Sequence, residues 1–266
     1  VDDARALYPD QWLLLDSAAP AAAPQGSNFA GTVGTFSQYC ENCGGETLDW
    51  PQITIGRLFM TAAGGASSCS ASVIGRNTIV TAAHCCYDSG AGAYNTDFSF
   101  APAYGNGATP FGLYDWQRVR ILRSYRTAPG RANDICLIRT RLESGQHVGD
   151  RVGWLGSAWN FDYLQNLHAV GYPGNIGSSE TMQLCTAQSA RPRAGCARNN
   201  VLNMGCSMTY GASGGPWIIG YRNQNLVNSV VSGYDDETCT GEFGTMFNGP
   251  RFTTSNFRAL CDGFGC

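Results

Sequence analysis

From residue 51 onward the chain consists of short β-like runs, and these limit its possible folds more than any other feature of the sequence. Glycine and asparagine separate the runs, and residues 118–123 alternate polar and apolar side chains, as in a strand with one solvated face. The runs lie at residues 53–60, 69–74, 78–82, 98–101, 118–122, 134–139, 167–172, 181–185, 217–221, 226–233 and 251–253. Many short strands joined by turns predict an antiparallel sandwich or barrels.

Residues 1–50 differ in composition from the rest. The first sixteen residues contain four aspartates, and an alanine- and proline-rich stretch follows at residues 18–25. Such a stretch is typical of an extended linker or of a strap over a surface. We therefore predict an N-terminal extension over residues 1–50, too short and too polar for its own core, and a folded domain over residues 51–266.

Charge and hydropathy limit the partners. The chain has 266 residues, 43% of them hydrophobic, and a formal net charge of −3. A net negative charge argues against nucleic acid or an anionic membrane surface as a partner. No apolar run approaches the roughly 20 residues of a membrane span. We predict no nucleic-acid partner and no membrane partner, and the start at Val1 is interpreted as a processed one.

Twelve cysteines indicate the compartment. An even, high count is typical of an oxidising environment, so we predict a secreted protein with up to six disulfides. The alternative is a zinc site, because Cys40 and Cys43 form a CxxC pair. No second CxxC and no HxxxH completes four ligands, and we therefore predict no metal and no cofactor.

A serine between small residues marks the segment 210–217, which reads YGASGGPW. Small neighbours leave the Ser213 hydroxyl uncovered and let backbone N–H groups point at whatever the serine attacks. Alone, such a turn is more often an ordinary loop. Two upstream segments change that interpretation, TAAHC at 81–85 and NDICLI at 133–138, because they add a base and an orienting carboxylate.

His84 and Asp134 are the candidates for these two roles. His84 follows the apolar run 79–83, which would hold its ring rigidly, whereas His147 and His168 have no such frame. Asp134 begins a second apolar run, and an unpaired buried charge costs several kcal/mol. A neutral imidazole N–H is one suitable partner. The alternative for Asp134 is a strand-edge aspartate in a turn.

These segments resemble the His, Asp and Ser motifs of the trypsin/chymotrypsin-like serine proteases, in that family's order. Ser232, nineteen residues after Ser213, matches a family serine that hydrogen-bonds the triad aspartate. The segments VGYPG at 170–174 and IGRL at 55–58 resemble the V8-like, glutamyl-endopeptidase branch. The resemblance covers residues 52 to 260, approximately.

The resemblance implies an all-β fold of two antiparallel six-stranded β-barrels, chymotrypsin-like, with a short C-terminal helix and an N-terminal extension. The first barrel would span about residues 52–145 and the second about residues 150–253. His84 and Asp134 would come from the first barrel and Ser213 from the second. A cap at Thr254 or Ser255 would begin the C-terminal helix.

The resemblance also implies the chemistry. Ser213 would attack a peptide carbonyl, His84 would accept and return the proton, and Asp134 would orient His84. The N–H groups of Gly211 and Ser213 would form the oxyanion hole. The predicted function is that of a secreted, monomeric serine endopeptidase acting on protein or peptide substrates through an acyl-enzyme. The alternative is an inactive binding or adhesive protein on the same fold.

The substrate site is expected around a second set of residues. The backbone of Ser232, Gly233 and Tyr234 would pair with an extended substrate, and Ser207 would lie on the floor of the specificity pocket. Gly233 and Gly249 are candidate pocket walls that leave room for the substrate's side chain.

Specificity departs from the branch pattern. The glutamate-cutting branch places a histidine just before the Ser232 position, where this chain has Val231, so we predict no preference for glutamate. The acidic residues 235–237 either supply negative charge to the pocket or form a solvated turn.

The chain has 17 arginines and no lysine. This bias reflects either a GC-rich genome or a protease that cuts after lysine and spares itself.

The resemblance implies some of the disulfide pairs. Cys69 lies fifteen residues before His84 and Cys85 follows it directly, as in the family's disulfide beside the histidine. A bridge from Cys206 to Cys239 would brace the pocket loops. Cys185–Cys196 and Cys261–Cys266 are predicted because the two cysteines of each pair are near in sequence, and Cys86–Cys136 would tie the histidine turn to the aspartate strand. Cys40 and Cys43 would then pair with each other, or else with another part of the chain.

Overall fold

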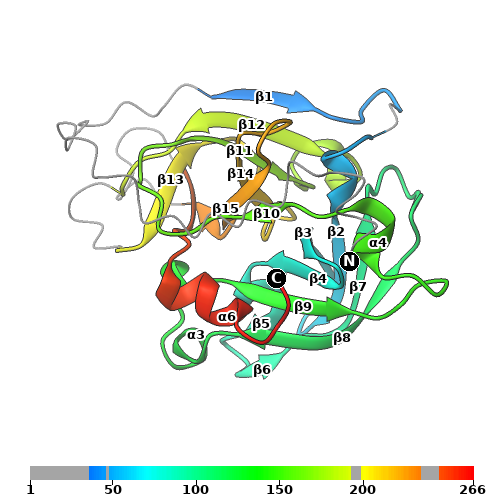
Figure 1. The fold of residues 1–266 in the computed structure, drawn as a ribbon, viewed down its shortest axis with the longest axis horizontal. Coiled ribbons are helices and arrows are strands. Elements are labelled where there is room, and N and C mark those ends of the chain that lie inside the picture. The colour runs from blue at the N-terminus through cyan, green and yellow to red at the C-terminus, as the bar shows by residue number, and fades with distance from the viewer. Residues whose placement is uncertain (1–35, 46–47, 193–198, 235–245) are drawn as a thin grey trace.

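The computed structural model describes residues 36–45, 48–192, 199–234 and 246–266. The chain forms two β units, one above the other in Figure 1, with short helices at their margins. The predicted all-β class is confirmed. No helix in the described ranges is long and apolar enough to cross a membrane.

The first unit is a closed six-stranded barrel. Its strands are joined in the order β2–β3–β4–β9–β8–β7, all antiparallel. Alternating side chains fill its interior, which includes the fully buried Leu58, Val73 and Phe100. Closure leaves no free edge in this unit. The strands are β2 (Ile55–Ala62), β3 (Gly65–Gly75), β4 (Thr78–Thr81), β7 (Thr96–Pro102), β8 (Tyr114–Ile121) and β9 (Cys136–Thr140).

The second unit is built from two sheets. A six-stranded sheet has the order β1–β12–β11–β14–β15–β10, and a three-stranded sheet has the order β13–β17–β16. Among the described strands, these sheets do not close into the second six-stranded antiparallel barrel that the resemblance implied. Only β10 and β15 pair in parallel among the described strands. The strands are β1 (Ser37–Cys40), β10 (Gly156–Ser157), β11 (Asn166–Gly171), β12 (Gln183–Gln188), β13 (Val201–Gly205), β14 (Pro216–Ile219), β15 (Leu226–Val230), β16 (Gly233–Tyr234) and β17 (Met246–Pro250).

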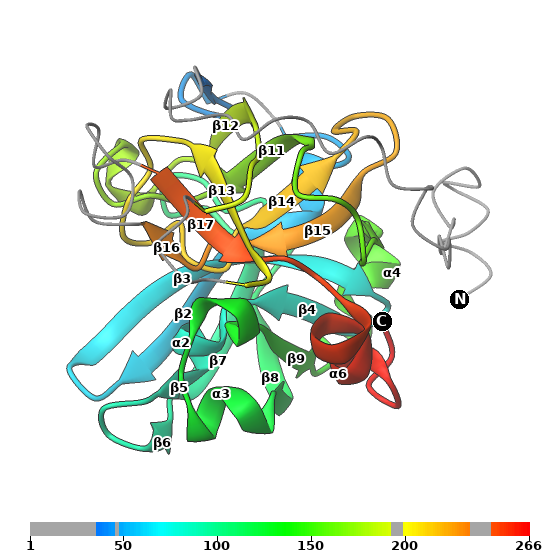
Figure 2. The ribbon, with the colours of Figure 1, turned by 90° about the vertical axis from the view of Figure 1, so that its left-hand side faces the viewer.

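Short elements connect the strands. A small hairpin of β5 (Tyr87–Asp88) and β6 (Ala93–Tyr94) lies beside the barrel. The helical turns are η2 (Gln52–Thr54), α2 (Ala83–Cys86), α3 (Arg123–Thr127), η3 (Arg131–Asn133), α4 (Val148–Val152), η4 (Gly177–Ser179), η5 (Thr254–Arg258) and α6 (Ala259–Cys261). Figure 2 shows α2 and α3 below β16 and β17, on one face of the molecule.

Part of the predicted N-terminal extension belongs to the second unit. Residues 37–40 pair with β12 as the edge strand β1, with Gln38 opposite Cys185. The alanine- and proline-rich stretch lies outside the described residues. Strand pairing therefore reaches back beyond the predicted boundary at residue 51, because β12 offers a free sheet edge to the preceding chain.

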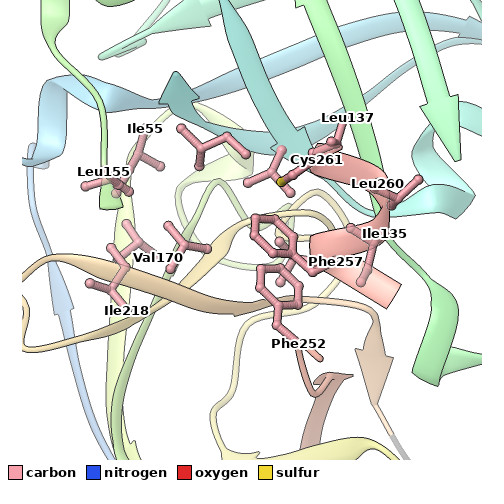
Figure 3. Close-up of a cluster of buried hydrophobic side chains, with 14 of the residues drawn as sticks. Ile55, Ile135, Leu137, Leu155, Val170, Ile218, Phe252, Phe257, Leu260 and Cys261 are labelled. Carbon is pink, nitrogen blue, oxygen red and sulfur yellow. The ribbon is translucent and has the colours of Figure 1, made fainter. Parts of the chain in front are cut away.

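A shared core holds the two units together. Figure 3 shows part of one buried cluster, which contains Ile55 and Leu137 from the barrel and Val170 and Ile218 from the second unit. The C-terminal helix closes this core, and the Phe252 and Phe257 rings stack with centroids 4.1 Å apart. Its cap is Thr253, earlier than the predicted Thr254 or Ser255, because the Asn256 side chain accepts from the Thr253 N–H at 2.6 Å.

Five disulfides join described residues, and two predicted pairs are wrong. The observed bridges are Cys40–Cys43, Cys69–Cys85, Cys86–Cys136, Cys185–Cys206 and Cys261–Cys266. Cys206 therefore does not pair with Cys239, and Cys185 does not pair with Cys196. Cys185 on β12 lies opposite the end of β13, with Cα atoms 5.7 Å apart, which is an ordinary disulfide spacing. Cys196 and Cys239 lie outside the described residues.

Candidate active site

His84 sits on a short helix that disulfides hold on both sides. The buried strand β4 leads into α2, which contains His84. Cys85 is bonded to Cys69 of β3, and Cys86 is bonded to Cys136 of β9. Two adjacent cysteines thus tie the histidine turn to two different strands of the barrel. These covalent bonds restrain the backbone that carries His84.

Asp134 is buried and accepts hydrogen bonds from three groups. Its side chain is 5% exposed, at the end of η3 and just before β9. The backbone N–H of His84 donates to Oδ1 at 2.8 Å, and His84 Nδ1 lies 2.8 Å from Oδ2. Ser232 Oγ donates to the same Oδ2 at 2.5 Å. The partner that a buried carboxylate requires is therefore the predicted histidine, helped by the predicted serine.

The electrostatics of this pair favour a charged carboxylate. Burial alone would raise the pKa of Asp134, but attraction to His84 and the hydrogen bonds from His84 and Ser232 hold it below its usual value. Burial alone would lower the pKa of His84, yet Asp134 outweighs burial and raises it. Arg131 opposes part of that rise through its positive charge. The carboxylate therefore stabilises a protonated imidazole.

Ser213 lies in a turn that packs against the histidine segment. The Ser213 carbonyl accepts from the Ser70 N–H at 2.7 Å, which ties the turn to β3. The next residue, Gly214, has φ +80°, and a Cβ there would lie 1.9 Å from Thr81 Oγ1 and 2.8 Å from the Ala82 nitrogen. Only glycine lets the turn approach this closely. Among the contacts of the described residues there is no hydrogen bond between the Ser213 hydroxyl and the His84 ring.

Two carbonyl groups of the Ser213 turn accept backbone hydrogen bonds, and these bonds orient the N–H groups of the same peptides. The Tyr210 carbonyl accepts from Gly174 N–H at 2.5 Å, and the Ala212 carbonyl accepts from Gly215 N–H at 2.9 Å. In a trans peptide the N–H points away from the C=O. The N–H groups of Gly211 and Ser213 belong to these two peptides, and in the described part of the chain neither donates to another group. Both are available to an anion.

Ser70 is a functional candidate that the sequence alone did not single out. Its hydroxyl donates to the Gly211 carbonyl at 2.8 Å and accepts from the Tyr172 N–H at 2.9 Å. The first bond holds the Gly211 carbonyl, and the second ties Ser70 to the backbone of Tyr172. A serine within a strand carries no local signal for such a role, because both partners are over a hundred residues away.

The residues predicted to bind substrate are held by contacts within the protein. Ser232 uses its hydroxyl on Asp134, and β16 pairs Gly233 with Asn248 and Tyr234 with Phe247. β16 is the edge of its sheet. Ser207 donates its hydroxyl proton to the Gln38 side chain of β1, and its carbonyl accepts from Asn175 Nδ2 at 2.8 Å.

Other atoms of the protein occupy the space beside the two glycines that were expected to leave room in the pocket. A Cβ at Gly233 would lie 2.2 Å from the Arg131 guanidinium, which also bonds the Asn248 side chain. A Cβ at Gly249 would lie 2.3 Å from both Ser229 Oγ and the Val230 carbonyl. The space beside Gly249 is therefore backbone packing, and the space beside Gly233 is taken by a long, charged side chain.

One cluster has a composition that suits a metal but cannot bind one as it stands. The His84 ring lies within 4.8 Å of the Cys69 and Cys85 sulfurs. Those sulfurs are joined to each other, so neither is the thiolate that a metal requires. The cluster is a disulfide that packs beside the histidine.

Comparison with known proteins agrees with this geometry. The family described as Trypsin matches residues 54–248. A glutamyl endopeptidase of Bacillus licheniformis is 26% identical over 110 residues, which are 41% of this chain and 33% of that protein. The match thus spans about a third of the relative's length.

Two solved structures share the fold. The protease Anisep from Arthrobacter nicotinovorans is 26% identical, with a TM-score of 0.75 over 86% of this chain and 99% of that one. The serine protease AL20, from an extremophilic microorganism, is 24% identical, with a TM-score of 0.71 over 80% of this chain and 97% of that one. These likenesses confirm the predicted chymotrypsin-like fold.

Proposed function

The chain belongs to the trypsin family of serine proteases, and from that membership we propose that it is a secreted serine endopeptidase that works through a Ser213–His84–Asp134 triad and an acyl-enzyme. The observation that carries the proposal is the buried Asp134 carboxylate, held by His84 Nδ1 at 2.8 Å and by Ser232 Oγ. This pairing makes Nδ1 the donor, which leaves Nε2 as the free base of the ring.

Each side chain then has one task. Ser213 Oγ attacks the peptide carbonyl and forms the new C–O bond, while its proton passes to His84 Nε2. The imidazolium gives that proton to the leaving amine as the C–N bond breaks. Water then attacks the acyl-enzyme in the same way: it gives a proton to His84 Nε2, and His84 returns the proton to Ser213 Oγ as the acyl bond breaks. Asp134 stays ionised throughout and stabilises the imidazolium, which agrees with the lowered pKa of Asp134 and the raised pKa of His84.

The oxyanion is assigned to the N–H groups of Gly211 and Ser213. Their carbonyl ends are held by Gly174 and Gly215, so the two donors are oriented before substrate binds. Preorganised donors of this kind contribute roughly 3–4 kcal/mol each to the transition state. Ser70 supports them through its bond to the Gly211 carbonyl.

Protein and peptide substrates fit the edge strand β16. Because β16 is at the margin of its sheet, its Gly233–Tyr234 backbone can pair with an extended chain. Ser232, just before it, links this strand to the triad. We propose a monomeric enzyme whose protease domain covers residues 51–266, with the closed barrel over about 52–145 and the second unit over about 150–253, and the preceding strand β1 extends that second unit. The described disulfides support secretion.

The pH dependence of activity follows from the raised pKa of His84. Only neutral His84 can accept the Ser213 proton, so kcat/KM should rise with a midpoint above the usual imidazole value of about 6.5 and level off by about pH 8. Arg131→Gln removes a charge that lowers the pKa of His84, so it should move the midpoint to higher pH. A rate that is constant from about pH 5 to about pH 9 would contradict this assignment.

Glutamate should not be preferred as the residue before the scissile bond. Val231 is buried in the core of the second unit and cannot reach a substrate carboxylate, and Ser207 offers only a neutral hydroxyl already bonded to Gln38. Cleavage of a peptide library that varies this residue measures the preference. Products confined to bonds after glutamate would refute the prediction, and products confined to bonds after lysine would support self-protection as the reason for the missing lysines.

The acyl-enzyme is tested by burst kinetics with an activated ester. We expect a rapid release of one equivalent of leaving group per folded chain, followed by a slower steady state. Release that is linear from the first turnover, together with no hydrolysis of peptides, would favour the inactive binding protein.

A further inference from the structure

A hollow on the first barrel, outside the catalytic centre, combines aromatic walls with arginines. It has a volume of about 500 Å³ and lies between α3 and the β5–β6 hairpin. The lining residues are Tyr87, Tyr94, Ile121, Arg123, Arg126 and Thr127. None of them takes part in the proposed reaction, so the hollow needs a separate explanation.

The walls are shaped by packing between aromatic rings. The Tyr87 and Tyr94 rings meet edge to face, with centroids 5.2 Å apart and planes at 73°. Tyr87 is almost fully buried, whereas Tyr94 is 43% exposed. The Arg126 guanidinium lies 5.9 Å from the centre of the Tyr87 ring. The hollow thus offers an apolar surface with a cation at its margin.

Its positive charge is not neutralised by neighbouring side chains. Arg123 and Arg126 are exposed, stand three residues apart on α3, and form no ion pair among the described residues. The nearest acid along the hairpin, Asp88, turns its Oδ1 to the N–H groups of Gly90 and Ala91 at 2.8 and 3.0 Å. Two cations on one helix face give the hollow a local positive potential, although the chain as a whole has a net charge of −3.

The hollow is close to the proposed catalytic centre. Tyr87 follows His84 by three residues, and the pKa of Tyr125 on α3 is raised by its burial and also by the negative charge of nearby Asp134. From α3 the chain runs to Arg131, whose guanidinium lies over Gly233 of the substrate-pairing strand. Figure 2 shows α2, α3 and β16 on the same face. The hollow thus lies on the face that carries the substrate-pairing strand.

We propose that this hollow is a second substrate-binding site, which takes an acidic segment of a protein substrate on the amino side of the scissile bond. The inference rests on the proposed protease function. Substrate residues before the scissile bond pair with β16, and Arg131 lies between that strand and α3. Carboxylates of the segment pair with Arg123 and Arg126, while the aliphatic parts of its side chains pack on Tyr87 and Tyr94.

The test compares two peptides that share one cleavable sequence. One carries an N-terminal extension of glutamates and glycines, and the other carries glutamines in place of the glutamates. We expect the acidic extension to raise kcat/KM about fivefold to tenfold through KM, and this advantage to disappear between about 0.02 M and about 0.5 M salt. The double variant Arg123→Gln with Arg126→Gln should lose the advantage and still cleave the shared sequence normally.

A matched control and a binding assay make the result decisive. Arg118→Gln removes the same charge from an exposed arginine of β8 that does not line the hollow, and it should keep the advantage. Equal rates for the two extensions, or an equal loss in Arg118→Gln, would overturn the proposal. Binding of the labelled acidic peptide to Ser213→Ala, followed by fluorescence anisotropy, tests the hollow even if the protein has no peptidase activity. Binding of a sulfated polysaccharide but not of the acidic peptide would also overturn it.

Discussion

Replacing Ser213 with alanine should lower kcat by about 10⁶-fold while the protein stays folded. The variant keeps the backbone that anchors the turn to Ser70 and removes only the hydroxyl that forms the acyl bond. Residual hydrolysis should come from the oxyanion donors and substrate binding, about 10³-fold above the rate in water. The measurement is kcat on a fluorogenic peptide, with circular dichroism to show that folding is unchanged.

Ser37→Ala is the matched control for that variant. Ser37 is an exposed serine of β1, so its loss should leave kcat within about twofold of the native value. Activity that survives in Ser213→Ala would show that another group is the nucleophile. Equal losses in both variants would point to a defect in folding rather than in chemistry.

Replacing Asp134 with asparagine should lower kcat by about 10⁴-fold near neutral pH. Asparagine has nearly the same shape, but its NH₂ group cannot accept the hydrogen bond that His84 Nδ1–H donates to the carboxylate at 2.8 Å. The ring would then present a protonated nitrogen to Ser213 and fail as a base. Loss of the carboxylate should also lower the pKa of His84, since attraction to Asp134 is what raises it.

A surface aspartate provides the comparison for Asp134→Asn. Asp150 pairs with Arg76 at 2.9 Å on the exposed face of α4, so Asp150→Asn should cost little activity. If the Asp134→Asn enzyme kept its full kcat at neutral pH, the carboxylate could not have the proposed role of orienting His84. The pH profiles of the two variants, measured side by side, separate an effect on His84 from a general loss of charge.

The parts of the site that depend on local sequence could be predicted. Asp134 heads a buried run, so its charge demanded a partner, and His84 follows an apolar run of residues that forms the buried strand β4. The bridge from Cys69 to Cys85 was implied by the family resemblance, and it is present together with the predicted bridge from Cys86 to Cys136. The alternation of polar and apolar side chains in residues 118–123 also indicated a strand, and most of that segment lies in β8.

The parts that depend on distant contacts could not be predicted. Cys185 and Cys206 pair because β12 and β13 lie side by side, which spacing alone does not reveal. Strand β1 was interpreted as part of a strap, since four residues with mixed polarity carry no signal until β12 supplies an edge. Gly233 was expected to leave space, and only the fold shows that Arg131 fills it.

The central claim is that Ser213 is the nucleophile and that His84 activates it, and active-site labelling tests this most directly. Native protein treated with a fluorophosphonate probe should gain one adduct, and peptide mapping by mass spectrometry should place it on Ser213. In folded His84→Ala the labelling rate should fall by several orders of magnitude. An adduct on another residue, or no adduct in folded native protein, would contradict the claim.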